Sequence, residues 1–516
     1  MMGTLSDFAK KFRPSTWTQK DAEEAKLGWH PGHPIPDDPL QWGGHFPQAA
    51  HETLKNTQMR RNLGYATGKI RAKRNLRVEE MPDWEGLREA ASNIKRTVAA
   101  DWVRLLEQFE ENVTKRGGVV HWARDAEEAN AIALNLISAK GVDEVVKVKS
   151  MATQEINLNE HLEKHGIKAW ETDLAEMIVQ LSEDMPSHIV VPAIHRNRAE
   201  VKAIFEARME DAQGLSDEPR ILAMAARAHL RKKFLTAKVA LSGANIGVAE
   251  TGTVGIFESE GNGRMCTTIP DITINICGIE KVVESFEDVA TLDTLLVPSA
   301  TGQFIVNYNN IISGPRRPGE KDGPKECHIV MLNNNRTSMV CSDEYFESLR
   351  CIRCGSCMNF CPVYDKIGGH SYRSVYPGPI GEVITPQIFG MSKNADMLTL
   401  CSLCGRCSEV CPVKIPLADT IRKLRRDKVG EGKNLATQGA NFSRLESITF
   451  HAYTGVLTNG FAFRSAINSA RFGNGIIKKF GKQIPVIKKW LQFKEFGDFS
   501  YDLHKNIKQI SGVIYE

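Results

Sequence analysis

The sequence predicts an α/β domain built on a parallel sheet, followed by a smaller cysteine-rich domain. Strand-like and helix-like segments alternate with short loops between residues 119 and 191, a β-rich region lies between 238 and 332, and one cysteine pattern appears twice, at 351–361 and 401–411. Such alternation is typical of parallel sheets covered by helices. A chain of 516 residues is also too long for one typical core, so two or more domains are expected.

Composition and charge are those of an ordinary globular protein. Hydrophobic residues make up 42% of the chain and the formal net charge is +4. The N-terminus lacks the apolar core of a signal peptide, and no run of about eighteen apolar residues occurs. We therefore expect a cytoplasmic protein without a membrane-spanning helix.

The two ends of the chain differ from the middle. We predict an N-terminal arm over 1–80, where the prolines between Trp29 and Pro36 exclude a regular helix. We predict a basic helical segment over 431–516. From residue 421 to the end, the chain has 17 Lys and Arg residues but only 7 Asp and Glu residues.

The α/β domain is predicted over 81–340, and it begins with a helix. From Pro82 to Arg116 apolar residues recur at three- and four-residue steps, which predicts one long helix ended by Gly117 and Gly118. These apolar positions are Trp84, Leu87, Ala91, Ile94, Val98, Trp102, Leu105 and Phe109.

The alternating region follows, with Asp125 as the expected N-cap of its first helix. Strands are predicted at 119–122, 144–149, 167–171 and 188–191, and helices at 125–140, 156–165, 174–181, 197–210 and 218–234. Further strands are predicted at 238–242, 246–249, 253–258, 272–279, 304–311 and 328–332, separated by glycine-rich turns.

Three glycine-rich loops, at 247–255, 260–264 and 313–319, are candidate ligand sites. Glycine lets a backbone approach a ligand, and arginine can hold a carboxylate or phosphate in a fork. The candidate residues are Glu250, Thr251, Gly252, Thr253, Asn262, Arg264, Arg316 and Arg317. Hairpin turns also favour glycine, so a purely structural role is the alternative. No dinucleotide fingerprint joins a strand to a helix, so neither NAD nor flavin is predicted in this chain.

The repeated cysteine pattern predicts two [4Fe–4S] clusters in a domain over 341–430. Both copies are the C-x2-C-x2-C-x3-C-P run, whose fourth cysteine ligates the other cluster. We assign Cys351, Cys354, Cys357 and Cys411 to the first cluster, and Cys401, Cys404, Cys407 and Cys361 to the second. Zinc is the alternative metal, although structural zinc sites pair two shorter cysteine hooks.

Residues inside these motifs also have expected roles. Gly355 and Gly405 allow the tight curl that directs N–H groups at sulfur, and Arg353 and Arg406 are expected to favour the reduced clusters. The four cysteines outside the motifs, Cys266, Cys277, Cys327 and Cys341, are expected to be small buried apolar residues.

Taken together, these segments resemble the lactate utilization protein B family from about His51 to about Leu424. The segments are Arg60–Leu63, Arg71–Arg74, Lys149–Met151, Pro192–His195, Ala249–Thr253, Glu260–Arg264, Gly278–Lys281, Ser313–Gly319, Pro377–Gly381 and both cysteine motifs. The extended, histidine-bearing N-terminal arm and the long basic tail are the least family-like parts.

The resemblance implies a LUD domain with an isomerase- or coenzyme A transferase-like sheet, then an all-α dicluster ferredoxin domain. It implies the iron–sulfur subunit of a three-protein, NAD-independent system that oxidises L-lactate to pyruvate. The expected partners are a cysteine-rich subunit and a smaller LUD subunit, with an acceptor such as quinone.

Two other functions stay open at this point. One is that the α/β domain is an acyl-transferring or isomerising enzyme with Glu250 as its base or nucleophile, and the other is that the clusters act as a redox-sensing device. Lysines and apolar residues mixed over 476–494 are compatible with peripheral contact to the inner face of the cytoplasmic membrane. Nucleic-acid binding is not expected, because no recognition motif accompanies the basic residues.

Overall fold

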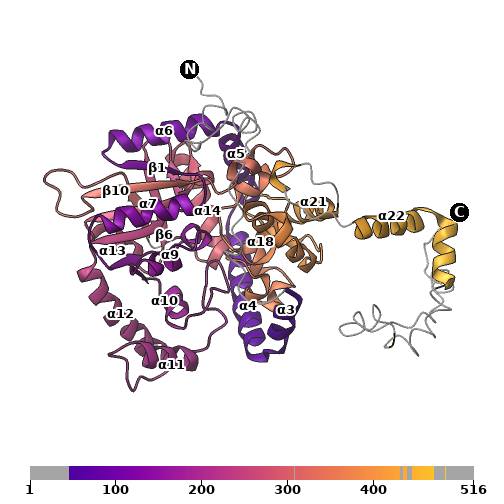
Figure 1. Ribbon diagram of the computed structural model, residues 1–516, viewed down its shortest axis with the longest axis horizontal. Helices are drawn as coiled ribbons and strands as arrows, with labels where there is room; N and C mark the ends of the chain where they lie inside the picture. Colours follow the sequence, from indigo (N-terminus) through magenta and orange to yellow (C-terminus); the bar gives the residue numbers. More distant parts are fainter. Residues whose placement is uncertain (1–45, 307, 430–433, 438–443, 470–482, 484–516) are drawn as a thin grey trace. The chain divides into compact units, whose positions relative to one another are not determined.

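The computed structural model describes residues 46–306, 308–429, 434–437, 444–469 and 483. These residues fall into one compact unit that ends at Asn441 and a second that begins at Phe442. Within the first unit, a sheet with its covering helices lies beside a helical part (Figure 1). The predicted domain limits at residues 80, 340 and 430 stay predictions.

The larger sheet has six parallel strands, as the alternation predicted. Their order is β1 (Val119–Ala123), β10 (Glu326–Leu332), β7 (Ile272–Gly278), β4 (Val239–Gly243), β2 (Glu144–Lys147) and β3 (Lys168–Glu171). Neighbouring residues of a strand face opposite sides, and both sides are apolar here because helices cover both. Val145 packs with α7 (Ala126–Ser138) and α9 (Leu158–Lys164), whereas Val146 packs with α10 (Leu174–Leu181), α11 (Arg198–Arg208) and α12 (Pro219–Thr236).

Local sequence signals explain several helix ends. The Asp125 carboxylate accepts a hydrogen bond from the Glu128 N–H at 2.9 Å, which confirms it as the N-cap of α7. α10 occupies the predicted residues 174–181. The α/β fold class is therefore confirmed.

Three sequence-based expectations about local structure were wrong. The long helix is divided at Asp101 into α5 (Trp84–Ala100) and α6 (Trp102–Lys115), although the apolar spacing continues across the break. Residues 188–191 form no strand, because the His188 ring nitrogen accepts the N–H groups of Val190 and Val191 that a strand ladder would use. The 260–264 loop contains the start of α13 (Asn262–Thr268).

A second, four-stranded sheet lies beside the first. Its order is β8 (Val282–Val283), β5 (Ile246–Val248), β6 (Thr253–Glu258) and β9 (Tyr308–Ile312). α14 (Phe286–Thr301), which was not predicted, contacts β5. Ser285 and Asp288 form a capping box at its start, and Gly302 ends it in the left-handed region.

After β10 the described chain contains helices and no strand, which confirms the helical nature of the cysteine-rich part. Its elements are α15 (Arg336–Val340), η2 (Phe346–Arg350), α16 (Ser356–Asn359), α17 (Tyr364–Ile367), η3 (His370–Tyr372), α18 (Gly378–Ile388), α19 (Met391–Asn394), η4 (Ala395–Leu400), α20 (Arg406–Val410), α21 (Leu417–Val429) and η5 (Leu435–Thr437). One apolar core joins these helices to α5, α6 and the second sheet.

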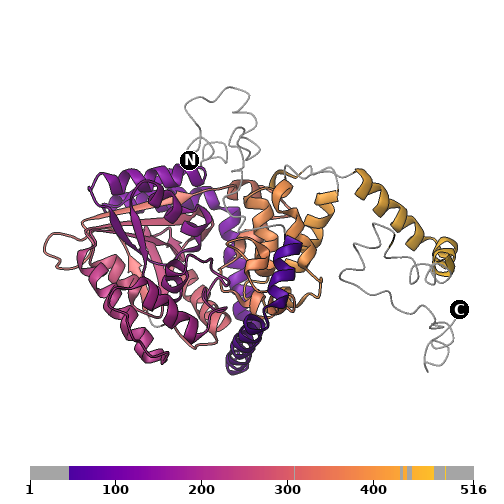
Figure 2. The same ribbon diagram turned by 60° about the horizontal axis from the view of Figure 1, so that its bottom comes forward.

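Two N-terminal helices pack on this helical part. α3 (Phe46–Lys55) contacts η3, and α4 (Thr57–Glu80) contacts α16 and α17, as the indigo helices in Figures 1 and 2 show. Thr67 of α4 donates to the Asp365 carboxylate at 2.8 Å, and Arg71 donates to the Asn359 carbonyl at 2.9 Å. The sequence did not predict these two helices.

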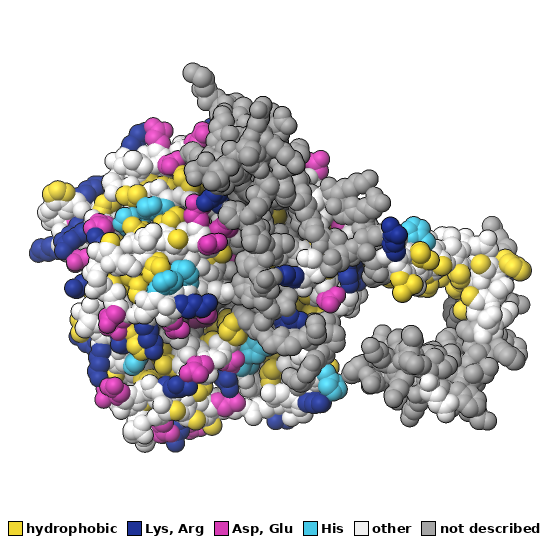
Figure 3. Space-filling model, viewed as in Figure 1, with side chains coloured by type: hydrophobic (Ala, Val, Ile, Leu, Met, Phe, Trp, Pro, Cys, Tyr) yellow, Lys and Arg dark blue, Asp and Glu magenta, His cyan; other side chains and the backbone are white. Residues whose placement is uncertain are grey.

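The second unit contains α22 (Arg444–Thr458), which exposes Leu445, Ile448, Phe450, Tyr453 and Leu457 (Figure 3). The basic residues predicted to form an amphipathic tail lie outside the described residues. No helix in the described part of the chain combines the length and apolar character needed to cross a membrane.

A buried ion network joins the large sheet to the helical part. Arg336, after β10, donates to both carboxylate oxygens of Glu155 at 2.8 Å and to Glu280 at 2.5 Å. Arg353 of the first cysteine motif lies 3.5 Å from Glu280, and the Tyr376 hydroxyl donates to Glu155. Burial alone would raise the pKa of Glu280, but Arg336, Lys281 and Arg353 hold it at about 2.

We predict that Arg336→Met lowers the free energy of unfolding by about 3–5 kcal/mol, because it leaves two buried carboxylates without their main partner. Lys232→Met, which removes an exposed ion pair to Asp211, is the matched control and should change stability little. Urea unfolding of the cluster-loaded protein under anaerobic conditions measures both. Equal stability of the two variants would contradict the role given to Arg336.

Candidate cluster sites and an adjoining cavity

The two cysteine motifs fold in the same way. Each follows a 3-10 helix, η2 or η4, and each leads into a short helix, α16 or α20, whose N-cap glycine has a positive φ of 73° at Gly355 and 81° at Gly405. Arg353 and Leu403, at equivalent positions, also have positive φ, of 61° and 56°. Their N–H groups donate to the sulfurs of Cys351 and Cys401 at 3.3 and 3.2 Å, as cluster ligation requires of the backbone.

The cysteines gather into two groups that cross between the motifs. The thiol of Cys354 interacts electrostatically with Cys411 and Cys351, and that of Cys357 with all three. In the same way Cys407 interacts with Cys401, Cys361 and Cys404. Cys357 also interacts with Cys407, so the groups are neighbours. The eight cysteines thus form two neighbouring groups, and the crossed assignment of cluster ligands stays a prediction.

The spacing within the groups favours a multinuclear centre over zinc. A zinc–sulfur bond of about 2.3 Å in a tetrahedral site brings the sulfurs to within about 3.8 Å of one another. Among the described residues, no three cysteine sulfurs lie within 4.8 Å of one another. The set of four thiolates with turned-in N–H groups fits a [4Fe–4S] cube, which is larger than a single ion.

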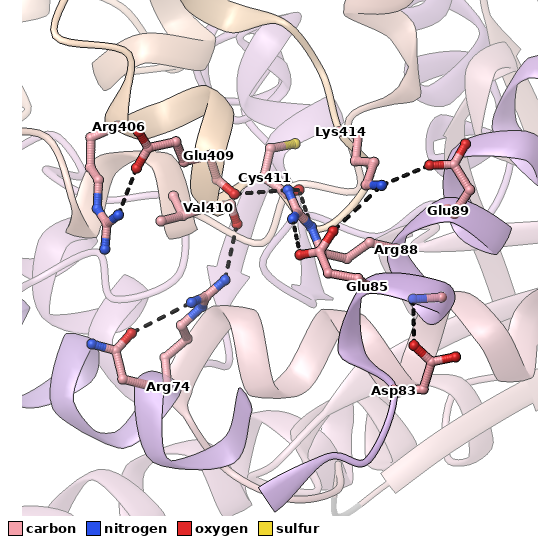
Figure 4. Close-up of polar contacts among 12 residues, drawn as sticks. Arg74, Asp83, Glu85, Arg88, Glu89, Arg406, Glu409, Val410, Cys411 and Lys414 are labelled. Carbon is pink, nitrogen blue, oxygen red and sulfur yellow. Dashed lines mark hydrogen bonds and ion pairs between the residues drawn. The ribbon is translucent and has the colours of Figure 1, made fainter. Parts of the chain in front are cut away.

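The N-terminal helices hold the end of the second motif (Figure 4). Arg88 of α5 donates to the carbonyl of Cys411 at 3.1 and 2.8 Å and to that of Glu409 at 2.8 Å. Arg74 of α4 donates to the Val410 carbonyl at 3.4 Å. Lys414, just beyond the motif, pairs with Glu89 at 2.7 Å. These contacts fix the position of Cys411 although its partner cysteines lie some fifty residues earlier.

The surroundings of the two groups carry different charge. Five cations interact with cysteines of the first group: Lys95, Lys281 and Arg353 with Cys351, Arg74 with Cys354, and Arg350 with Cys411. Beside Cys361 and Cys401 of the second group lies Glu382, whose pKa burial raises well above its usual value despite the nearby Arg425. Arg406 is exposed and pairs with Glu409 at 2.6 Å. Positive surroundings favour the more negative, reduced state of a bound cluster, so they would favour reduction of a cluster held by the first group.

A cavity of about 470 Å³ lies at the carboxyl-terminal edge of the six-stranded sheet. Within the large sheet, β2 is followed by β3 on one side. β4 is followed by β7 on the other side, after β5 and β6 of the second sheet. The connections from the neighbouring strands β2 and β4 therefore diverge at this edge. Ligands of open α/β sheets bind at such a switch point. Lys149 and Ser150, after β2, and Gly243 and Ala244, at and after the end of β4, line the cavity.

The first cysteine loop closes the cavity from the opposite side. Ile352 and Arg353 line it, together with Tyr376 and the Glu280–Lys281 segment that follows β7. The Arg353 guanidinium lies 4.7 Å from the centre of the Tyr376 ring. The cavity therefore adjoins both the sheet and the loop that carries Cys351 and Cys354.

The glycine-rich loops occupy different places, and their assignment as ligand loops stays a prediction. Of the eight candidate residues, Asn262 lines the cavity. Thr251 donates to Thr253, whose hydroxyl lies 3.2 Å from that of Ser313, so the first and third loops meet. Gly252 is required by close packing, because a Cβ there would lie 2.3 Å from the Val113 nitrogen.

The charged candidates of these loops are exposed and engaged locally. Glu250 accepts a hydrogen bond from the Phe286 N–H at the start of α14, at 3.1 Å, and does not line the cavity. Arg316 donates to the Lys321 carbonyl at 3.5 Å. Arg264 and Arg317 are exposed as well.

Sequence reasoning did not select Lys149, Glu280, Lys281, Arg336 or Tyr376 as site residues. Two of the segments that carry the family resemblance, Lys149–Met151 and Gly278–Lys281, contribute residues to the cavity lining. The resemblance was therefore the sequence feature that could have identified Lys149, Glu280 and Lys281.

Comparison with known proteins identifies both parts of the chain. The LUD domain model matches residues 106–332, and the 4Fe-4S dicluster domain model matches residues 347–415. A lactate utilization protein B of Bacillus velezensis is 42% identical over 390 residues, which cover 75% of this chain and 81% of that protein.

Two further relatives cover similar or longer parts. A lactate utilization protein B of an Exiguobacterium species is 38% identical over 87% of this chain and 94% of its own length. An uncharacterized electron transport protein of Escherichia coli is 41% identical over 75% of this chain and 81% of its own length. At these identities and coverages, the chain belongs to the lactate utilization protein B family.

Proposed function

We propose that this chain is the iron–sulfur electron-transfer subunit of a multi-subunit, NAD-independent system that oxidises L-lactate to pyruvate. The observation that carries the proposal is the meeting of eight cysteines in two adjacent groups, in a chain whose relatives are named for lactate utilization and electron transport. We assign Cys351, Cys354, Cys357 and Cys411 to one [4Fe–4S] cluster, and Cys401, Cys404, Cys407 and Cys361 to the other. Each cluster, when bound, supplies one-electron transfer.

The different burial of the two groups supports a relay. Cys354 and Cys357 are buried behind the cavity, whereas Cys404 and its neighbours Ser402 and Leu403 are exposed. An exposed second site suits electron transfer to a partner protein. Oxidation of lactate removes two electrons and two protons, so a partner that accepts the pair is required.

We further propose that the partners are a cysteine-rich subunit and a smaller LUD subunit, and that quinone is the final acceptor. The complex would work in the cytoplasm, at the inner face of the membrane. The exposed apolar residues of α22 are compatible with docking of the second unit on a partner or a membrane surface.

Cysteine variants test the crossed ligand sets. Cys404→Ala is expected to lower the iron content from about eight to about four atoms per chain, because the second cluster loses a ligand. Cys341 lies outside both motifs and is exposed, so the expectation that it is buried was wrong. Cys341→Ala should keep about eight iron atoms and is the matched control. Iron analysis and EPR of the dithionite-reduced protein measure both.

The crossing itself is tested by comparing residual EPR spectra. Cys411→Ala should retain the same cluster as Cys351→Ala, and Cys361→Ala the same cluster as Cys401→Ala. Matching of Cys411→Ala with Cys401→Ala instead would show that each motif holds its own cluster.

The relay is tested by adding L-lactate anaerobically to the cluster-loaded chain, with and without the two expected partners. We expect both clusters to become reduced when the partners are present, as followed by absorbance and EPR. If lactate reduces neither cluster in the full mixture while dithionite reduces both, the chain is an electron carrier for a different substrate.

A further inference from the structure

Lys281 differs from the other charged residues of the cavity between the sheet and the first cysteine loop. It lines that cavity, it is only partly exposed, and it has no hydrogen bond or ion pair with another described residue. Burial and the neighbouring Arg353 lower the pKa of its ammonium group. A buried ammonium group is stable when an anion accompanies it.

The remaining cations of the cavity already have partners. Arg336 is enclosed by Glu155 and Glu280. Arg353 faces Glu280 and the Tyr376 ring, and Lys149 donates to the Ile189 carbonyl. Lys281 interacts electrostatically with Glu280 but makes no hydrogen bond or ion pair with a described residue, so it is the described lining cation whose N–H donors are open to an incoming anion.

The acidic side chains of the lining are also engaged. Glu258 accepts the N–H groups of Gly263 and Arg264 at 2.9 and 2.7 Å. Asp173 accepts the Ala175 and Glu176 N–H groups as the N-cap of α10. Glu260 accepts the Leu174 N–H at 3.2 Å, and burial followed by the Asp173 charge raises its pKa to about 7. At neutral pH a carboxyl group with this pKa is partly protonated. Glu260 therefore repels an anion less and can exchange a proton with a bound hydroxyl group.

The cavity also has an apolar wall. Leu296, Val297 and Ala300 of α14 line it, as does Ile256 of β6. A volume of about 470 Å³ lies within the range of small-molecule sites and exceeds the needs of a three-carbon acid. A ligand with one anionic end and a short alkyl chain matches this combination.

We propose that the cavity binds a small carboxylate of the 2-hydroxy- or 2-oxo-acid class, with its carboxylate on Lys281 and its alkyl chain toward α14. This inference rests on the proposed function and adds to it a place for the acid in this chain, next to the first cysteine group. The site is a binding site; the partner that accepts the electron pair completes any oxidation.

A second role for Lys281 has to be separated from binding. Lys281 interacts electrostatically with Cys351, as Lys95 does. Lys95 donates to the Glu280 carbonyl at 2.6 Å and does not line the 470 Å³ cavity. Both lysines add positive charge near the first cluster site and both line a small adjoining pocket, but Lys281 alone of the two lines the 470 Å³ cavity. Lys95→Met is therefore the matched control.

The test is isothermal titration calorimetry on the cluster-loaded full chain without partners. The probes are L-lactate, pyruvate, L-2-hydroxyhexanoate and inorganic phosphate. We expect the carboxylates to bind, and L-2-hydroxyhexanoate to bind more tightly than lactate by up to about fourfold per added methylene. Lys281→Met should weaken binding roughly ten- to hundredfold, as for loss of a charge-assisted hydrogen bond. Lys281→Arg should retain binding within a few-fold, and Lys95→Met should leave it unchanged.

A redox titration followed by EPR gives the second readout. Both Lys281→Met and Lys95→Met should lower the potential of the first cluster, because each removes a nearby positive charge. The binding inference is overturned if no carboxylate binds, if phosphate binds better than every carboxylate, or if Lys95→Met weakens binding as much as Lys281→Met. Cluster content and partner-dependent reduction by lactate, measured on the same preparations, test the proposed function separately.

Discussion

The buried ion pairs of Arg336 are the interaction on which the arrangement of this molecule depends. Glu155, Glu280 and Arg336 follow β2, β7 and β10, so the network crosses the carboxyl-terminal edge of the large sheet. One guanidinium binds both buried carboxylates there and is their main partner. Arg353 and Tyr376 extend the network into the helical part. The first cysteine loop is thereby held against the edge at which α/β sheets bind ligands.

The α/β part and the cluster part consequently act as one body. Their common core contains Cys357 and Cys411 together with Cys277 of β7 and Val282 of the second sheet. Arginines from the N-terminal helices hold the end of the second motif by its backbone carbonyls, which leaves the cysteine side chains free to face the cluster. Because one apolar core joins the α/β part and the cluster part, we expect a structural change on either side of the cavity to alter the surroundings of the first cysteine group.

Local patterns were predictable and distant pairings were not. Fixed cysteine spacing determines how each loop curls, and the crossed ligand sets named from that spacing stay a prediction. Lys281 and Arg353 meet only because β7 ends beneath the first cysteine loop, and no periodicity encodes that meeting. The strand predicted at 188–191 failed because the His188 ring takes the backbone donors, a side-chain contact that propensity ignores. α4 was missed, although Met59, Leu63 and Thr67 recur at four-residue steps and are all buried.

If the proposed relay holds, the difference between the two cysteine groups gives its electron transfer a direction. Burial raises the pKa of the Cys357 thiol, so a thiolate there needs positive charge nearby, and five cations supply it around the first group. Around the second group, Leu403 and Cys404 reach the surface, so solvent stabilises part of the thiolate charge there. A buried, positively surrounded site beside a cavity suits the uptake of an electron, and an exposed site suits its transfer to another protein.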